Sequence, residues 1–265
     1  MKVAVAQLSS SIDKQANVEK AKKYITKAKN SGADFIVFPE LYMADVLSPD
    51  IMPGEVAEPV DGPFVRSLAD SAREHQIYVV CGIYETAPHD TQRAYNTTIF
   101  LDRSGKLLQA YRKTHLYDAF NFNESDTIIP GSSSGDVIET EFGTVGLMVC
   151  YEVRFPEICR KLALDGADFI FMPAAWAAGL MKEDHWQTIL KTRAIENTIY
   201  VFAADQVGNI FSGRSMIVDP MGVILSGAGE EESLIISEID IDRIKRVREK
   251  LPSVADRKPE LYSTI

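Results

Sequence analysis

A near-repeat constrains the fold of this chain more than any other feature of its sequence. The residues Gly-Ala-Asp-Phe-Ile at 32–36 recur at 166–170, a separation of 134 residues. Each copy leads to a proline at the same offset, Pro39 and Pro173. A motif that recurs with its flanking features predicts two halves built in the same way.

The same order of expected elements surrounds both copies. It comprises a first strand (3–8 and 145–150), a helix, the Gly-Ala-Asp strand, a second helix (64–76 and 186–198), an Ile-Tyr-Val strand (77–79 and 199–201) and a hairpin turning at 102–105 or 219–222. Strands alternating with helices are typical of β-α-β units. The strand segments are apolar throughout instead of alternating, which predicts strands covered on both faces.

Two half-sheets that face each other, with helices outside, give an α/β fold of the four-layer αββα sandwich type. No Pro-, Gly- or Ser-rich linker separates the halves, so we expect residues 1–265 to form a single domain. The tail is predicted to be helical from Arg243 and irregular from Pro252.

The charge balance argues against two classes of partner. The 28 Lys and Arg against 38 Asp and Glu give a net charge of −10, whereas nucleic acids and anionic membranes require clustered basic residues. The longest apolar run, 169–181, contains Pro173 and is shorter than the ~20 residues that span a bilayer. The N-terminal segment lacks the pattern of a signal peptide, so we expect a cytoplasmic protein that binds neither nucleic acid nor membrane.

Cysteine usage and motif content argue against metals and cofactors. Cys81, Cys150 and Cys159 are an odd number without CxxC spacing, which indicates neither a disulfide framework nor a zinc site. The sequence has no HExxH, P-loop or GxGxxG motif, so no metal and no cofactor is expected. Cys81 and Cys159 are interpreted as core residues.

Three ionisable residues follow expected strands, where ligands bind in open α/β folds. Glu40 follows the strand at 35–38, Cys150 follows 145–149, and Lys113 ends the strand at 107–112. Taken singly, Glu40 could form an ion pair at a strand end, Cys150 could be a small buried hydrophobic residue, and Lys113 could be a solvated hairpin residue. Together they are sufficient for catalysis, because a carboxylate can deprotonate a thiol and a cation can stabilise an oxyanion.

Five segments carry a resemblance to a known family. They are FPELY around Glu40, RKTHLYD around Lys113, FNES around Glu124, GLMVCYEVRFPE around Cys150 and GRSMIVDPMG from Gly213. In this order, and with the closing RKPELY, the whole chain resembles the nitrilase, or carbon-nitrogen hydrolase, superfamily. The resemblance implies an αββα fold and a Glu-Lys-Cys triad of Glu40, Lys113 and Cys150, with Glu124 as a second glutamate that positions substrate.

The expected reaction is hydrolysis of a small amide through a thioester. Glu40 takes the Cys150 proton, the thiolate attacks the carbonyl carbon, and Lys113 with the backbone N–H of Tyr151 holds the oxyanion. Glu40 returns the proton to the leaving amine. After ammonia departs, Glu40 activates the water that cleaves the thioester.

Further segments indicate the branch and the pocket. CYEVRFPE, the PAAW that contains Trp176, and KEDHW resemble the branch of omega-amidases and deaminated-glutathione amidases. Tyr151 and Trp176 are expected to bind substrate. Arg154 is expected to hold a substrate carboxylate, with an ion pair to Glu152, Glu157 or another structural carboxylate as the alternative.

Several other functions stay open. An N-carbamoyl amino acid hydrolase and an aliphatic nitrilase are the nearest alternatives, although true nitrilases usually have tryptophan where this chain has Tyr151. A catalytically silent binding or scaffold protein is the alternative from another class.

The GxSxG match at 131–135 lacks the strand-to-helix context of a nucleophile elbow. A Cys-His protease would need a partner among His75, His89, His115 and His185, and a structural hydrogen bond is the expected role of His115.

A homodimer is also expected. The helix at 156–164 carries the apolar residues Ile158, Leu162 and Ala163 among basic ones, the tail after Pro252 is irregular, and the family pairs its sandwiches back to back. Two-fold symmetry is the commonest form of assembly.

Overall fold

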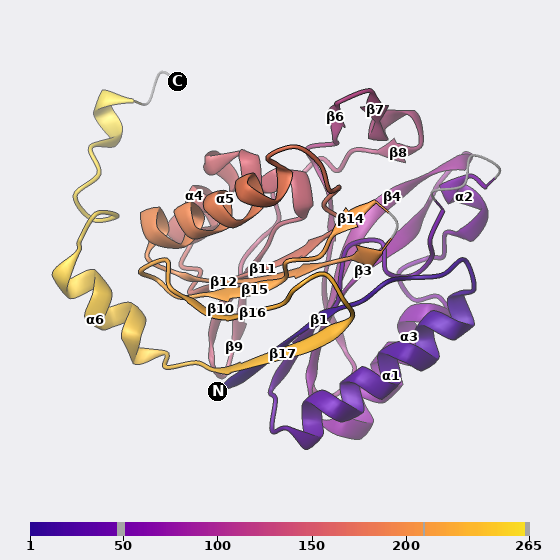
Figure 1. Ribbon diagram of the computed structural model, residues 1–265, viewed down its shortest axis with the longest axis horizontal. Coiled ribbons are helices and arrows are strands. Elements are labelled where there is room, and N and C mark those ends of the chain that lie inside the picture. The colour runs from indigo at the N-terminus through magenta and orange to yellow at the C-terminus, as the bar shows by residue number, and fades with distance from the viewer. Residues whose placement is uncertain (47–50, 209, 263–265) are drawn as a thin grey trace.

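The computed structural model describes residues 1–46, 51–208 and 210–262 and contains two main sheets (Figure 1). The first has the order β17-β1-β2-β3-β4-β5, with β8 beside β4. Its strands are β1 (Lys2–Gln7), β2 (Phe35–Val37), β3 (Tyr78–Ala87), β4 (Asp90–Leu101), β5 (Leu107–Arg112), β8 (Ile128–Ile129) and β17 (Ser233–Glu238).

The second sheet has the order β16-β15-β12-β11-β10-β9. Its strands are β9 (Ile138–Thr140), β10 (Gly143–Leu147), β11 (Phe169–Ala174), β12 (Tyr200–Asp205), β15 (Met216–Val218) and β16 (Ile224–Gly227). In each sheet the central strands are parallel, and antiparallel strands flank them.

The two sheets pack face to face through aromatic side chains. The ring of Phe171 on β11 lies 5.5 Å from that of Phe35 on β2 and 6.1 Å from that of Phe100 on β4, measured between centroids. These fully buried rings belong to one core that both sheets share. The apolar strands thus bury one face against the opposite sheet and the other against helices.

Helices cover the outer faces of both sheets (Figure 1). Helices α1 (Lys14–Asn30) and α3 (Pro63–His75) pack on the first sheet through a second core that includes Ile25 and Leu68. Helices α4 (Pro156–Leu164) and α5 (Lys182–Asn197) cover the second sheet with Leu162 and Leu190. The predicted four-layer αββα sandwich is confirmed.

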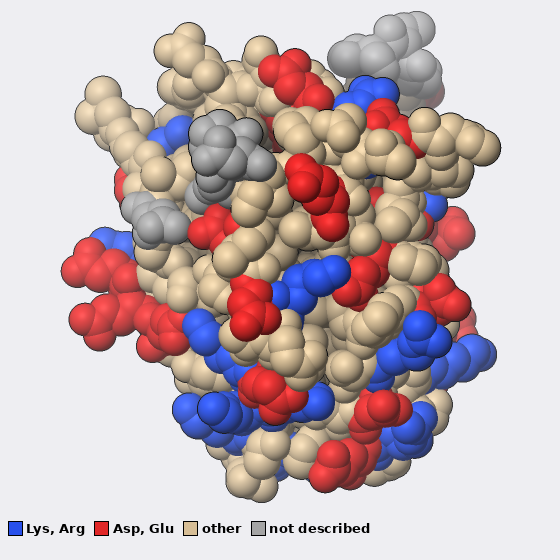
Figure 2. Space-filling model, turned by 90° about the vertical axis from the view of Figure 1, so that its right-hand side faces the viewer, with Lys and Arg blue, Asp and Glu red and all other residues tan. Residues whose placement is uncertain are grey.

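Short elements connect these layers. They are α2 (Pro53–Val56), β6 (Asp118–Ala119), β7 (Phe122–Asn123), β13 (Val207–Gly208), β14 (Phe211–Ser212) and the 3₁₀ helices η1 (Glu124–Asp126), η2 (Cys150–Arg154) and η3 (Pro259–Leu261). None of the helices in the described ranges is long and apolar enough to cross a membrane. Acidic and basic side chains are interspersed on the face shown in Figure 2, most densely in its lower part.

The repeated Gly-Ala-Asp motif has the same structural role in both halves. The carboxylate of Asp34 accepts the backbone N–H of Lys2 at 2.9 Å, and that of Asp168 accepts the N–H of Thr144 at 3.1 Å. Gly32 and Gly166 precede them with φ of +81° and +104°, a region that glycine adopts without steric cost. The motif therefore ends a helix and fixes the next strand beside its parallel neighbour.

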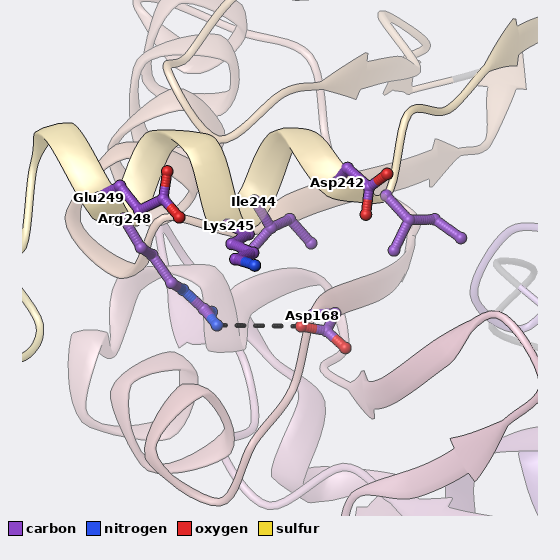
Figure 3. Close-up of a pocket in the computed structure, with 7 residues that line it drawn as sticks. Asp168, Asp242, Ile244, Lys245, Arg248 and Glu249 are labelled. Carbon is purple, nitrogen blue, oxygen red and sulfur yellow. Dashed lines mark ion pairs between the residues drawn. The ribbon is translucent and has the colours of Figure 1, made fainter.

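The C-terminal helix α6 (Asp242–Lys250) confirms the predicted helical start of the tail. Its buried residues Ile244 and Val247 face the body of the protein. A shallow pocket of about 520 Å³ lies between α6 and Asp168, and Arg248 points across it with an N–O distance of 3.9 Å (Figure 3). Helix α6 thus packs against the second half of the sandwich.

One strand boundary differs from the sequence prediction. The strand expected at 145–150 ends at Leu147, and Cys150 begins the 3₁₀ helix η2 instead. The buried Glu152 carboxylate accepts the N–H of Val149 at 2.8 Å, which turns the chain out of the sheet. The hydrogen bond of Glu152 therefore ends the strand earlier than the run of apolar residues predicts.

Candidate active site

A cavity of about 790 Å³ contains most of the side chains singled out from the sequence. Among the described residues, its lining includes Glu40, Lys113, Glu124, Cys150, Tyr151 and Trp176, but not Arg154. Residues from both halves form its walls. The loops that follow the central strands of both sheets thus meet at one place. This agrees with the general observation that ligands bind beyond the carboxyl ends of the strands in α/β folds.

The Glu40 carboxylate joins the two halves of the sandwich. Its Oε1 accepts hydrogen bonds from Lys113 Nζ at 2.8 Å and from Asn96 Nδ2 at 2.7 Å. Its Oε2 accepts the backbone N–H of Ala175, just after β11, at 2.7 Å. Because these donors hold both oxygens, the orientation of this buried carboxylate is fixed.

Lys113 lies between two carboxylates. Its ammonium donates to Glu124 Oε2 at 2.8 Å and to Glu124 Oε1 at 3.0 Å, in addition to Glu40. Burial alone lowers the pKa of Lys113, but the charges of Glu124 and Glu40 prevail and raise it well above its usual value. Lys113 is therefore a fixed cation in this cluster.

The Cys150 thiol lies at a strained turn. Its φ of +47° is in the left-handed region, which costs a residue with a Cβ about 1–3 kcal/mol. Burial raises the pKa of this thiol well above its usual value, the negative charge of Glu40 raises it further, and Lys113 opposes them. A nucleophilic Cys150 therefore needs a base that accepts its proton as it reacts.

Gly82 allows β3 to approach the residue that follows β2. A Cβ at position 82 would lie 2.4 Å from the backbone nitrogen of Leu41 and 2.6 Å from the Cα of Glu40. Leu41 itself has a φ of +52°, so the chain turns sharply after Glu40. The absence of a side chain at Gly82 therefore permits the close backbone packing of β3 against Glu40.

Gly82→Ala is expected to lower turnover by about 10²-fold, because misplacement of a reacting group by about 1 Å can cost that much. The steric clash should also lower the free energy of unfolding by about 1–3 kcal/mol. Steady-state kinetics and urea unfolding measure the two effects, with Gly229→Ala as a control because a Cβ at that glycine meets no atom within 4 Å. Wild-type turnover in Gly82→Ala would show that Glu40 tolerates this displacement.

Sequence reasoning missed several residues around the cluster. Asn96 on β4 donates from one Nδ2 to both Glu40 and Glu124. Asp205 ends β12, accepts the N–H of Trp176 at 2.7 Å, and has a pKa raised well above its usual value by burial. Gln206 donates to the backbone oxygen of Glu40 at 2.9 Å. Asp205 and Gln206 follow an apolar strand, so the rule that selected Glu40 could have found them.

Arg154 lies outside the cavity lining. Its guanidinium carbon is 4.8 Å from the centroid of the Trp176 ring, and Nη2 is 3.5 Å from His185 Nδ1. In the described part of the chain, Arg154 forms no ion pair with Glu152 or Glu157; the Glu152 carboxylate instead accepts the N–H of Thr114 at 2.7 Å and that of Val149. The Arg154 guanidinium thus lies against the ring of Trp176, which lines the cavity, and is not itself part of the described lining.

The other sequence candidates have structural environments. His115 contacts Thr114 Oγ1 at 2.9 Å and packs on the ring of Phe155. Cys81 and Cys159 are fully buried in the two cores, as expected. The GxSxG segment at 131–135 lies in irregular chain between β8 and β9, without the strand-turn-helix of a nucleophile elbow.

The apolar residues of α4 that the sequence analysis linked to a dimer contact are buried within the chain. Ile158, Leu162 and Ala163 of α4 are 5%, 0% and 8% exposed and belong to the core between α4 and the second sheet. The apolar spacing of this helix reflects packing within the chain. The apolar residues of α4 therefore give no support to a dimer contact, and the homodimer stays a prediction.

An αββα sandwich with a glutamate, a lysine and a cysteine in one cavity defines a class of C–N hydrolases, and the comparisons agree. The chain belongs to the carbon-nitrogen hydrolase family, whose model matches residues 2–249. It is 33% identical over 258 residues to the deaminated glutathione amidase of Escherichia coli O157:H7, covering 97% of each chain.

Two solved structures are similar over nearly the whole chain. Saccharomyces cerevisiae Nit3, a member of branch 10 of the nitrilase superfamily, has a TM-score of 0.85 and 33% identity, with 95% of this chain and 94% of Nit3 covered. An amidase mutant from Nesterenkonia sp. AN1 has a TM-score of 0.83 and 26% identity, covering 99% and 95%. It was solved with the acetamide moiety of fluoroacetamide covalently added to its active-site cysteine.

Proposed function

We propose that this protein hydrolyses the C–N bond of a small amide through a thioester on Cys150, releasing ammonia. One observation carries the proposal: Glu40, held by Lys113 and by Ala175 N–H, lines the same cavity as the buried Cys150 thiol. The cavity thus combines a base, a fixed cation and a nucleophile. Covalent addition to the active-site cysteine of the Nesterenkonia amidase supports a cysteine nucleophile.

The steps follow from the protonation states. Glu40 accepts the Cys150 proton while sulfur attacks the amide carbon, so that a free thiolate is never required. The ammonium of Lys113 and the backbone N–H of Tyr151 stabilise the oxyanion. Glu40 then protonates the leaving nitrogen, ammonia departs, and Glu40 deprotonates the water that opens the thioester. Each cycle returns Cys150 as a thiol and Glu40 as a carboxylate.

Glu124 and Asn96 are positioning residues in this proposal. Glu124 binds Lys113 through both oxygens, and Asn96 connects Glu124 with Glu40. Together they hold the ammonium at one side of the cavity, which is the preorganisation that stabilises developing charge.

The proposed substrate is an amide that also carries a carboxylate. The supporting comparisons are relatives named deaminated glutathione amidase and omega-amidase NIT3. The test is ammonia release from a panel of neutral amides, monoamides of dicarboxylic acids, N-carbamoyl amino acids and nitriles. Monoamides should react best. Release from carbamoyl compounds or nitriles alone would replace the amidase function, and release from none would indicate a silent protein that retains the fold.

We also propose that residues 1–265 form a single domain and that the protein is cytoplasmic. Contacts that cross between the halves at the cavity, such as Ala175 to Glu40 and Gln206 to Glu40, support a single unit. All three cysteines are free thiols, which suits a reducing compartment.

We propose a homodimer that uses the outer surface of the second half. Ile195 on α5 and the adjoining turn residues Met221 and Val223 are 41%, 47% and 51% exposed, although all three are apolar. Light scattering at micromolar concentration should give twice the chain mass of 29.4 kDa, and Ile195→Glu should give a single chain. A wild-type mass of 29.4 kDa contradicts the dimer.

A further inference from the structure

A buried lysine lines the substrate cavity without a carboxylate beside it. Lys182 is 7% exposed and lines the same cavity as Cys150. Its ammonium donates to the hydroxyl of Tyr117 at 2.5 Å. Within residues 1–46, 51–208 and 210–262, no Asp or Glu oxygen lies within 4.0 Å of this ammonium. Lys113, the other lysine in the described lining, is already paired with two glutamates.

The position of Lys182 is unfavourable for a cation. It is the first residue of α5, and the N-terminal end of a helix carries partial positive charge. Of the acidic residues in the same turn, Glu183 accepts the N–H of Gly179 and Asp184 is exposed. A charge that breaks a local rule without full compensation is typical of a functional site.

Aromatic rings compensate this charge only in part. The Lys182 ammonium lies 4.5 Å from the centroid of the Tyr117 ring, 4.6 Å from that of Phe120 and 5.4 Å from that of Trp176. Cation–π contacts stabilise an ammonium but take up none of its hydrogen-bond donors. The rings therefore fix the side chain while leaving it able to bind an anion.

The pair Lys182–Tyr117 presents adjacent donors. An ammonium has three N–H donors, of which Tyr117 accepts one, and the hydroxyl of Tyr117 keeps its own proton. An N–H and an O–H held side by side match the two oxygens of a carboxylate, and charge-assisted bonds of this kind are strong.

Tyr117 also connects this pair with the catalytic cluster. Its backbone N–H donates to Glu124 Oε2 at 2.7 Å, and Glu124 holds Lys113. A group bound by Lys182 thus stands at a fixed separation from the amide that Cys150 attacks. We propose that Lys182 and Tyr117 bind the carboxylate of a substrate whose amide is at its other end.

This proposal rests on the proposed amidase function and assigns the residues that recognise the carboxylate of its substrate. It moves the carboxylate site from Arg154, which sequence reasoning favoured, to Lys182. Arg154 stacks on Trp176 outside the cavity lining, whereas Lys182 lies within it.

The test compares kcat/KM for succinamic acid with that for butanamide, in which a methyl group replaces the carboxyl group. Lys182→Met should lower the ratio of the two constants by about 10²-fold, mainly through KM, because the carboxylate loses its charge partner. Lys191→Met, which removes a charge from the same helix outside the described lining, should leave the ratio within about threefold.

Other variants separate the competing explanations. Tyr117→Phe should lower the ratio about tenfold through loss of one donor, and it remains informative if Lys182→Met does not fold. An unchanged ratio in both variants overturns the proposal. A selective loss only in Arg154→Met assigns the carboxylate to that arginine.

A binding measurement is independent of turnover. Succinate should protect Cys150 from alkylation by iodoacetamide in the wild type, and this protection should be lost in Lys182→Met. If the wild type releases no ammonia from either amide, the amidase proposal fails while succinate protection still tests the carboxylate site. Equal protection in the two proteins overturns the site even if the amidase is active.

Discussion

Cys150→Ala is expected to reduce amide turnover by at least about 10⁴-fold. The variant removes the atom that forms the thioester, and no other described thiol can replace it, because Cys81 and Cys159 are fully buried in the cores. Loss of a covalent nucleophile removes the whole route, so the remaining rate reflects only binding and the oxyanion site. The measurement is single-turnover and steady-state ammonia release.

The fold of Cys150→Ala should persist. Burial keeps the pKa of the Cys150 thiol well above its usual value, so the thiol is uncharged and alanine removes only a small buried group. The melting temperature should therefore fall by no more than a few degrees. Cys159→Ala is the matched control: it should lose stability from a core cavity but retain turnover. Retention of more than a tenth of wild-type turnover by Cys150→Ala would discard the thioester mechanism.

The near-repeat predicted the sandwich because the same hydrogen bonds of Asp34 and Asp168 recur in space. The positions of Glu40, Lys113 and Cys150 were predictable because strand ends meet at one edge. The turn at Cys150 was not, since it depends on the Glu152 carboxylate, which binds Val149 locally and Thr114 across the fold.

Lys182 illustrates another limit of sequence reasoning. A lysine in the first turn of a polar helix resembles a solvated side chain, and only the rings of Tyr117, Phe120 and Trp176 place it in the cavity. Phe120 and Tyr117 come from a segment that is distant in sequence. Arg154 was selected because it is close to Cys150 along the chain, yet its guanidinium lies against the Trp176 ring and outside the described cavity lining.

Lys113→Met should lower both turnover and stability. It removes the ammonium while leaving Glu40 and Glu124 buried, 2% and 6% exposed. Among the described residues, Asn96 would then be the one side chain that bonds to both. Breaking a buried ion pair at one partner costs about 3–5 kcal/mol. Turnover should fall by at least about 10³-fold, because the oxyanion loses its cation.

The stability loss in Lys113→Met should depend on pH. Two buried carboxylates without the cation cannot both be charged, so one of them acquires a raised pKa in the folded variant. The folded state then binds a proton that the unfolded state releases, and stability falls as pH rises above the usual carboxyl range, by about 1.4 kcal/mol per unit until the raised pKa is passed. Urea unfolding between pH 5 and 8 should show this slope in Lys113→Met relative to the wild type.

The double variant Lys113→Met with Glu124→Gln separates stability from catalysis. It leaves Glu40 as the single carboxylate of the cluster, still bonded to Asn96 Nδ2 and Ala175 N–H. The repulsion between two buried carboxylates is gone, so part of the stability should return and the slope with pH should become smaller. Turnover should not return, because the ammonium that stabilises the oxyanion is still absent. Recovery of turnover in the double variant would show that Lys113 serves only to neutralise Glu124, and the oxyanion would then need another donor.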